Sequence, residues 1–311
     1  MVRCVPTLRF VNTPKILPIP PLEGRVVTLD LAFAAGDRYE TATRPFIEEL
    51  GLRLARWIDH HPHPAWERYE GDPRFMLVDK TVAPACPQLV TPALVDEIGE
   101  VDHLFAHADF DGMITAVKYL LRGEAPYPEA DEDGRAVDAP GQGFVCSERG
   151  MRLARAVERS RDAHPNRHPD FLLQMAEALV QGREPPELSA VIDRYDAQAR
   201  KREAEVRKYL EHVEQDHPRI LVLRLPRMIS PADKKNLLRD LEERATLGVI
   251  EEPSSVTVAT FDTRMRLTEI RGLHGTDGFA WGRARYDDVR AQLIEMVEAL
   301  DSSALREDRE R

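Results

Sequence analysis

Residues 103–123 read HLFAHADFDGMITAVKYLLRG, and this stretch decides the predicted fold. Its first five residues have Leu104, Phe105 and Ala106 between two histidines and predict a buried strand, and residues 113–121 carry a helical pattern that ends before a glycine. A polar segment joins the two and contains His107, Asp109 and Asp111. In an open parallel sheet, ligands bind at the carboxyl ends of the strands. The stretch therefore predicts a strand–helix unit with its polar side chains at the ligand-binding edge.

Two earlier predicted strands also end in aspartate or histidine residues. Residues 25–31, RVVTLDL, are rich in β-branched residues and end near Asp30. Residues 54–61, LARWIDHH, end in an aspartate and two histidines. A helical pattern over residues 41–51 separates these strands, and a further short strand is predicted over residues 75–79. Strands that alternate with helices predict a parallel α/β sheet.

Three separate stretches would thus bring carboxylates and imidazoles to one edge of the sheet. Oxygen ligands suit Mn²⁺ or Mg²⁺, and imidazole suits transition metals. Without a cation, carboxylates crowded at one edge would repel one another and their pKa values would rise. Each stretch alone has a plainer interpretation, since Asp30 would also serve as a helix cap and HADFDG as a polar loop. Taken together, the three stretches favour a divalent-metal site.

The second half of the chain has a different organisation. Residues 189–215 form a long, highly charged helical pattern, which predicts a connecting helix. A strand-rich segment follows from residue 220, and we expect residues 256–261 and 264–270 to pair as a hairpin. The predicted domains are a catalytic domain over residues 1–188, a connecting helix over residues 189–216 and a smaller α/β domain over residues 217–311.

The composition is that of an ordinary globular protein, with 42% hydrophobic and 31% charged residues among 311. No apolar run approaches the ~18 residues that span a bilayer. The proline-rich residues 1–24 lack the pattern of a secretory signal and are predicted to be an irregular arm. The three cysteines show no C-x-x-C pair, which indicates a reducing, cytoplasmic compartment. The net charge of −11 argues against the binding of long duplex DNA by bulk electrostatics.

Two motifs resemble those of a known superfamily. Residues 57–64, WIDHHPHP, resemble the signature of the DHH phosphoesterase superfamily, and residues 107–121, HADFDGMITAVKYLL, resemble its metal-binding first motif in the form typical of RecJ-like nucleases. Asp30 stands 29 residues before Asp59 and matches the second motif in spacing. The resemblance implies a parallel-sheet catalytic domain that a long helix joins to a smaller α/β domain. It also implies two divalent cations, Mn²⁺ foremost and Mg²⁺ as the alternative.

The resemblance further implies roles for individual residues. Asp30 would bridge the two ions, Asp59 would ligate or orient the second ion, and His61 would hydrogen-bond the scissile phosphate. The implied metal ligands are Asp30, Asp59, His60, His107, Asp109 and Asp111, and the implied catalytic residues are His61 and Asp59. The family's fourth-motif aspartate stays open between Asp79, Asp138, Asp131 and Asp133.

The smaller domain would supply substrate binding. Residues 271–278, RGLHGTDG, resemble the family's glycine-rich substrate loop in a degenerate form, since Leu273 replaces a glycine and Asp277 stands where a small residue is usual. Trp281, just beyond the loop, is a candidate for stacking on a base. The implied substrate-binding residues are Arg271, His274 and Gly275.

The order of the motifs departs from the family. The first motif normally precedes the second and third, but here it follows them, at residues 107–112. A circular permutation of the catalytic domain accounts for this order, because chain ends that lie close together tolerate permutation. The alternative is that the true first motif is lost and the site is weakened or inactive.

The resemblance therefore implies a Mn²⁺-dependent phosphodiesterase acting on short oligonucleotides, single-stranded nucleic acid ends or cyclic dinucleotides. Two bound ions would activate a water and stabilise an in-line displacement at phosphorus. The alternatives are a pyrophosphate or polyphosphate hydrolase and a degenerate nucleotide-binding homologue without catalysis. We expect an oligonucleotide or nucleotide partner and no membrane, while a homodimer stays open.

Overall fold

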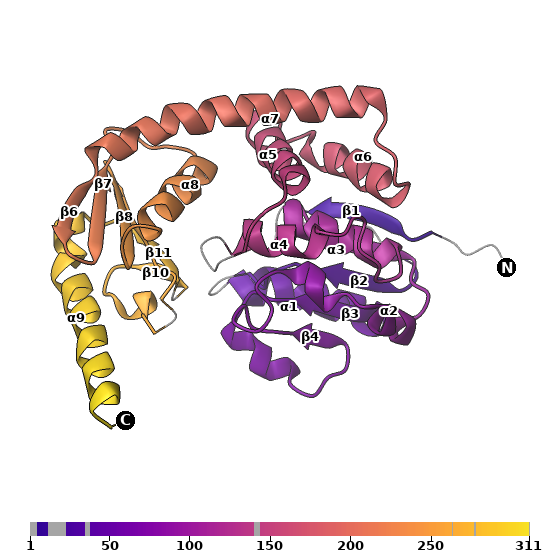
Figure 1. Ribbon diagram of the computed structural model, residues 1–311. Helices are drawn as coiled ribbons and strands as arrows, with labels where there is room; N and C mark the ends of the chain where they lie inside the picture. Colours follow the sequence, from indigo (N-terminus) through magenta and orange to yellow (C-terminus); the bar gives the residue numbers. More distant parts are fainter. Residues whose placement is uncertain are drawn as a thin grey trace. The chain divides into compact units, whose positions relative to one another are not determined.

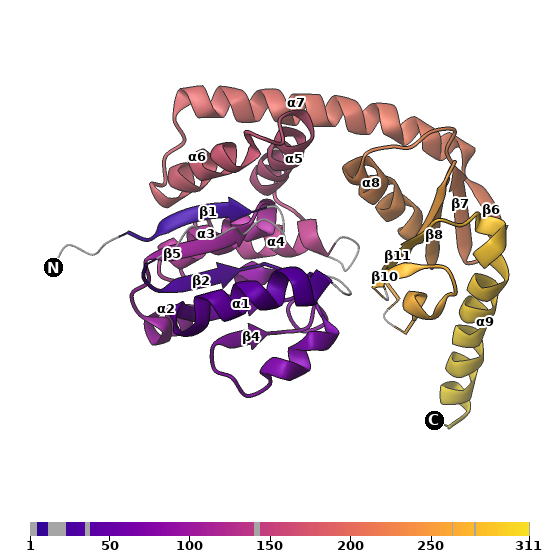
Figure 2. The same ribbon diagram turned by 180° about the vertical axis from the view of Figure 1, so that it is seen from behind.

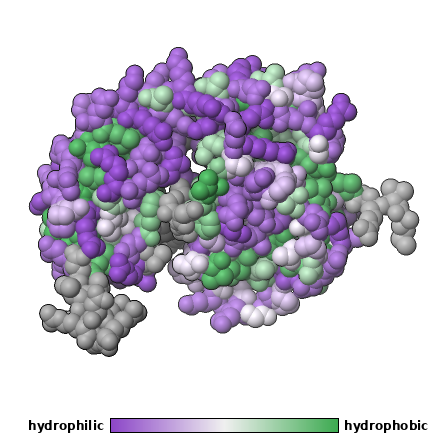
Figure 3. Space-filling view, viewed as in Figure 1, coloured by the Kyte–Doolittle hydropathy of each residue, from purple (hydrophilic) through white to green (hydrophobic). Residues whose placement is uncertain are grey.

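The structure is a computed structural model that describes residues 5–11, 23–34, 38–139, 144–262, 264–276 and 278–310. The chain divides into two compact units, Met1–Ala199 and Arg200–Arg311. Each unit has its own sheet (Figure 1, Figure 2). Each also has its own apolar core. The face seen in Figure 3 is mostly hydrophilic. Among the described residues, no helix combines the length and the apolar character needed to cross a membrane.

The first unit contains a five-stranded sheet with the strand order β1-β5-β2-β3-β4. Its strands are β1 (Thr7–Val11), β2 (Val26–Leu29), β3 (Leu54–Asp59), β4 (Phe75–Leu77) and β5 (His103–His107). All four neighbouring pairs are parallel. The predicted parallel α/β sheet is therefore confirmed, and the carboxyl ends of its strands lie at one edge.

The central strands alternate their side chains between two apolar layers. Phe105 of β5 points to one face and packs with residues of α1 (Arg44–Leu50). Its neighbour Leu104 points to the other face and belongs to the layer formed with α2 (Pro92–Ile98) and α3 (Phe110–Leu120). Both faces of the sheet are thus covered, which explains why its strands read as nearly continuous apolar runs.

The N-terminal arm contains a strand that the sequence analysis does not predict. Residues 1–24 are expected to be irregular, but Thr7–Val11 pairs in parallel with β5 and places Leu8 opposite Leu104. The expectation is wrong for these five residues because their strand character comes from the partner: the pairing with β5 buries Phe10. Proline-rich flanks gave no local sign of it.

Four further helices follow in the chain: α4 (Ala130–Asp138), α5 (Glu148–Ala163), α6 (His168–Val180) and α7 (Pro186–Arg207). The boundary between the two units falls within α7. This helix ends at Arg207 and not at residue 215 as predicted, because a short 3-10 helix, Lys208–His212, and strand β6, Glu214–His217, follow it. Charged residues suit an edge strand as well as an exposed helix, so the pattern alone did not locate the end.

The second unit contains a six-stranded mixed sheet with the order β10-β11-β9-β8-β7-β6. Its strands are β6 (Glu214–His217), β7 (Ile220–Arg224), β8 (Leu247–Glu252), β9 (Ser255–Ala259), β10 (His274–Thr276) and β11 (Phe279–Gly282). Strands β7 and β8 pair in parallel around α8 (Pro231–Glu242), and the other described pairs are antiparallel. Helix α8 packs with one apolar layer of this sheet and α9 (Tyr286–Glu310) with the other.

One predicted hairpin is absent from the second unit. Strand β9 pairs with β8 and β11, whereas residues 264–270 include a short 3-10 helix, Leu267–Glu269, in the described part of this segment. Met265, Leu267 and Ile270 are buried in the core beneath α9. Their apolar side chains therefore fill the core from a loop, and the strand-like pattern of the sequence was misleading.

Candidate metal centre

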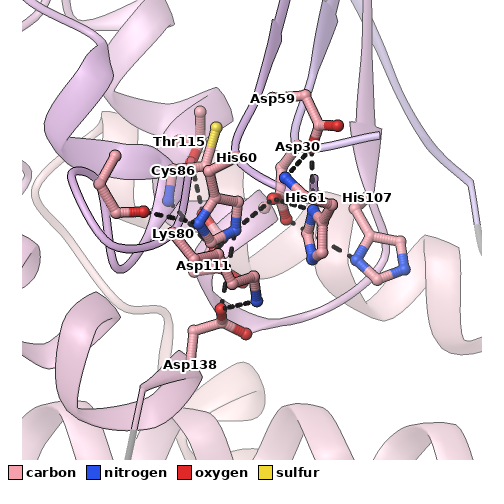
Figure 4. A network of polar contacts seen from close by, with 12 residues as sticks. Asp30, Asp59, His60, His61, Lys80, Cys86, His107, Asp111, Thr115 and Asp138 are labelled. Atoms are coloured by element: carbon pink, nitrogen blue, oxygen red, sulfur yellow. Dashed lines mark hydrogen bonds and ion pairs between the residues drawn. The ribbon is translucent and has the colours of Figure 1, made fainter. Parts of the chain in front are cut away.

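The carboxyl ends of three adjacent strands carry the polar side chains. His107 ends β5, Asp59 ends β3, and Asp30 follows β2, which lies between them. Figure 4 shows these side chains turned toward one another. The sheet order thus brings together three stretches that are far apart in the sequence.

Asp30 is held in an unusual backbone conformation. Its φ angle is 58°, in the left-handed region that residues other than glycine seldom adopt. Its backbone N–H donates to the Ile58 carbonyl at 2.8 Å, and its side chain is fully buried. Such a conformation costs of order 1–2 kcal/mol and persists where the surrounding structure holds it, often at functional sites.

Three groups of side chains have ligand atoms within 4.8 Å of one another. The first group is Asp30, His60 and His61, the second is Asp30, His107 and Asp109, and the third is His60, Asp111 and Asp138. Asp30 belongs to two groups and so does His60. The predicted ligands Asp30, His60, His107, Asp109 and Asp111 therefore lie together, and the groups adjoin through shared members.

The two carboxylate oxygens of Asp30 face different histidines. Its Oδ1 lies 3.2 Å from His60 Nε2 and 3.7 Å from His61 Nδ1, whereas its Oδ2 lies 3.7 Å from His107 Nδ1. Ligand atoms about 2.0–2.2 Å from one small cation lie roughly 3–4 Å apart. This spacing suits ligands of a small cation, and the two oxygens of Asp30 face different members of the cluster.

Buried polar atoms in this cluster lack hydrogen-bond partners. Both oxygens of Asp30 and the Nε2 atom of His60 are buried and have no partner among the described residues. Leaving such atoms unpaired costs about 1–3 kcal/mol each, and more for charged groups. His60 Nδ1 lies 2.9 Å from the Ala83 carbonyl, so it carries the proton and Nε2 presents its lone pair to the cluster. The donor set therefore fits a divalent cation.

Asp59 stands apart from the three groups. Its Oδ1 accepts a hydrogen bond from His61 Nδ1 at 2.8 Å, and its side chain is fully buried. This bond fixes the His61 ring, whose side chain is 30% exposed, and directs Nε2 away from Asp59. Burial opposes charging of the ring, but the bond to Asp59 and the nearby Asp30 raise the pKa of His61. The contact suits the orienting role of Asp59 more directly than the ligating one.

The charges of the cluster depend strongly on one another. Burial, together with the charges of Asp30 and Asp138, raises the pKa of Asp111 well above its usual range. Burial also disfavours ionisation of Asp30, but the imidazoles of His107 and His61 outweigh it and hold its pKa well below its usual range. Without a cation the carboxylates therefore share the site by retaining a proton on one of them.

Among the four candidates for the fourth-motif aspartate, Asp138 is the one that joins a described group. Its Oδ2 lies 3.6 Å from His60 Nε2. Asp79 instead accepts from Thr81, Asp131 binds Lys118, and Asp133 accepts from the backbone and hydroxyl of Ser147. No local signal in the sequence separates Asp138 from the other three.

Sequence reasoning also missed three neighbours of the cluster. Lys80 Nζ donates to Asp138 Oδ2 at 2.6 Å. His168 Nε2 lies 2.9 Å from the carbonyl of Ala108, which stands in the sequence between two predicted ligands. Its Nδ1 lies 2.5 Å from Ser160 Oγ. The Cys86 backbone N–H faces Asp111, and burial together with nearby carboxylates raises the pKa of its thiol, so it does not provide a thiolate nucleophile.

The predicted substrate-binding residues lie in the second unit. His274 opens β10 opposite Trp281, with ring centroids 6.5 Å apart. Gly275 has a φ angle of 145°, and a Cβ atom there would lie 2.3 Å from the Phe279 carbonyl, so the hairpin requires a glycine. The Arg271 backbone N–H donates to Gln292 Oε1 at 3.0 Å. Asp277 and Cys4 lie outside the described residues.

Comparison with known proteins gives the following likenesses. No family model and no curated protein matches the sequence. A solved structure of the exonuclease RecJ bound to manganese is 16% identical, with a TM-score of 0.45 over 89% of this chain and 75% of that one. The pGpG-specific phosphodiesterase PggH from Vibrio cholerae is 10% identical, with a TM-score of 0.43 over 89% of this chain and 99% of that one. RecJ in complex with Mg²⁺ from Thermus thermophilus is 20% identical, with a TM-score of 0.36 over 62% of this chain and 33% of that one.

The sequence motifs and the fold agree with one another. The stretches that resemble the first, second and third motifs end at one edge of a parallel sheet, and a second unit with a mixed sheet follows. In its motifs and in the arrangement of its elements, the protein is similar to the DHH phosphoesterase superfamily.

Proposed function

We propose that this protein is a metal-dependent phosphodiesterase, with Mn²⁺ as its foremost cofactor, that hydrolyses short oligonucleotides, single-stranded nucleic acid ends or cyclic dinucleotides. One observation carries the proposal. Both oxygens of Asp30 and the Nε2 atom of His60 are buried without a hydrogen-bond partner among the described residues, and they lie in a cluster of further carboxylates and imidazoles. A divalent cation is the partner that satisfies such a set of donors.

Asp30, Asp59 and His61 would have different roles in the hydrolysis. Bound cations would supply an activated water and stabilise the charge that develops on the phosphoryl oxygens. Asp30 lies between His60 and His107, and one of its carboxylate oxygens faces each of the two rings. Asp59 fixes the ring of His61, which leaves the exposed side of that ring to donate a hydrogen bond to a phosphoryl oxygen. Such a bond strengthens as negative charge grows in the transition state.

The second unit supports a substrate that contains bases. Phe279 and Trp281 lie two residues apart on β11, on the same face of the strand, and are 43% and 48% exposed. Exposed aromatic side chains on a strand stack on bases with little sequence preference. Pyrophosphate offers nothing to stack, so this pair favours an oligonucleotide or nucleotide. The net charge of −11 in turn favours short substrates over long duplex DNA.

The first prediction concerns the activity. Purified protein with Mn²⁺ is given 2–5-residue oligonucleotides, a cyclic dinucleotide, a model phosphodiester and pyrophosphate, and product formation is measured by chromatography. We expect metal-dependent hydrolysis of the phosphodiesters. Asp109→Ala removes a candidate ligand and His61→Ala removes the proposed phosphate contact, so each should lower kcat/KM at least about 100-fold.

A matched control is available on the same strand. His103 begins β5 at the opposite end from His107, and its Nε2 atom contacts the Glu23 carbonyl at 3.0 Å. His103→Ala should therefore keep nearly full activity. Hydrolysis of pyrophosphate alone would favour a pyrophosphatase, and nucleotide binding without turnover under any divalent metal would favour a non-catalytic binding protein.

A further inference from the structure

Lys80 places a positive charge inside the proposed metal centre. It lies in the loop after β4, and its Nζ atom donates to Asp138 Oδ2 at 2.6 Å, with 37% of its side chain exposed (Figure 4). The same oxygen of Asp138 lies 3.6 Å from His60 Nε2. A lysine side chain is a cation at neutral pH. Its contact with Asp138 therefore places a positive charge at the edge of the cluster.

The ammonium ion and a metal ion compete for the same carboxylate. Asp138 completes the group with His60 and Asp111, and a cation in that group would draw on the oxygen that now accepts from Lys80. Two positive charges only a few ångströms apart also repel each other, and partial burial strengthens the repulsion. Both effects act in the same direction and weaken the binding of the ion.

The charges of this one group lead to the same conclusion. Asp111 and Asp138 carry two negative charges when ionised, and one divalent cation in the group that they form with His60 carries two positive ones. Lys80 adds a further positive charge beside Asp138, so its removal should tighten the binding of a cation in this group.

We propose that Lys80 sets the affinity of the ion site formed by His60, Asp111 and Asp138 by competing with that ion for Asp138. Lys80 is then a positioning residue that acts through Asp138. In the metal-free protein it occupies this carboxylate, and the site fills only at higher Mn²⁺ concentration than the site around Asp30, His107 and Asp109. The inference rests on the metal centre of the proposed function and goes beyond it by ranking the two sites.

Isothermal titration of the full chain with Mn²⁺ tests this ranking. We expect the wild type to bind two ions in steps of different affinity. Lys80→Met should tighten the weaker step about tenfold, the order of effect of removing one charge beside a partly buried ion, and leave the stronger step unchanged. Lys80→Arg keeps the charge and should behave as the wild type.

A control and a second readout separate this role from a structural one. Lys234 forms a comparable pair with Glu252 in the second unit, with 2.5 Å between Nζ and Oε2, so Lys234→Met should leave Mn²⁺ binding unchanged. Thermal unfolding of Lys80→Met should show a lower midpoint without metal and a larger rise on addition of Mn²⁺ than the wild type shows. A purely structural role would lower the midpoint equally with and without Mn²⁺.

The outcomes are distinct. Two ions bound by the wild type with an unchanged or weakened second step in Lys80→Met would overturn the role of Lys80 and leave the proposed function standing. If the wild type binds a single ion, the inference requires Lys80→Met to bind a second, and its failure to do so rejects the inference. A wild type that binds no Mn²⁺ rejects the metal centre and the inference together.

Discussion

The residue Gly112 lies where the metal centre has no room for a side chain. It is in the first turn of α3, and its backbone N–H donates to Asp109 Oδ1 at 3.1 Å. A Cβ atom at this position would lie 2.5 Å from the His107 carbonyl oxygen and 3.0 Å from Asp30 Oδ2. The glycine therefore allows the helix to begin directly against the cluster of candidate ligands.

The second prediction concerns this glycine. In Gly112→Ala, the new methyl group should push the candidate ligands Asp30 and His107 apart. We expect a loss of stability of about 1–3 kcal/mol, as for other overpacked sites. Because the ligands move, Mn²⁺ affinity should fall as well. Urea unfolding and Mn²⁺ titration measure the two effects.

Gly182→Ala is the matched control for this change. Gly182 has a φ angle of 62° and no atom within 4 Å of an added Cβ, so its substitution strains only the backbone, by about 1 kcal/mol. We expect lower stability with unchanged Mn²⁺ affinity. An unchanged Mn²⁺ affinity in Gly112→Ala would show that the close contacts of Gly112 do not govern the metal centre.

At the scale of an element, helix α8 carries a carboxyl group in an unfavourable place. Glu242 is the last residue of α8, where the helix dipole already disfavours a negative charge. Burial raises the pKa of Glu242 from its ordinary value of 4.5 to about 8. Below pH 4.5 the folded and unfolded chains both hold this proton. Between pH 4.5 and 8 the unfolded chain releases it first, so stability falls as the pH rises.

The third prediction follows from this sign. Glu242→Gln removes the ionisable group and should raise the unfolding midpoint of the second unit at pH 8 more than at pH 5. Glu243→Gln changes the exposed neighbouring residue and should have little effect at either pH. Thermal unfolding at the two pH values measures the difference. Equal shifts at both values would contradict a raised pKa at Glu242.

At the scale of the whole molecule, the candidate metal ligands and the exposed aromatic pair belong to different units. All residues of the three metal groups lie between Asp30 and Asp138, in the first unit. Trp281 lies in the second unit, which has its own core. The chemistry and the stacking surface are therefore carried by separately packed parts of the chain.

The fourth prediction uses this division. Mn²⁺ should stabilise the first unit by about 2.7 kcal/mol at 100 times its dissociation constant. For a unit of this size, that corresponds to a rise of roughly 5–10 °C in its unfolding midpoint. The second unit should unfold at an unchanged temperature. Differential scanning calorimetry with and without EDTA measures this, and a shift of the second unit alone would count against the proposed site.

The order of the motifs also belongs to the whole molecule. We propose that the catalytic unit is a circular permutation of the family's arrangement. The support is that β5, which ends at the first-motif residue His107, lies beside β2, which Asp30 follows, although β5 comes later in the chain. A metal centre depends on the order of strands in the sheet and not on their order in the sequence.

The sequence by itself determined the parallel α/β sheet and the polar residues at the carboxyl ends of its strands, such as Asp30 and His107. The reason is that apolar periodicity and the residues at strand ends are local features of the sequence. Only the tertiary structure decided that Asp138, and not Asp79, joins the cluster, and that Lys80 faces it. It also decided that the N-terminal arm supplies β1. The physical reason is that these contacts join segments far apart in the sequence through packing and strand pairing. The residues that neighbour each segment in the sequence therefore do not indicate its distant partner.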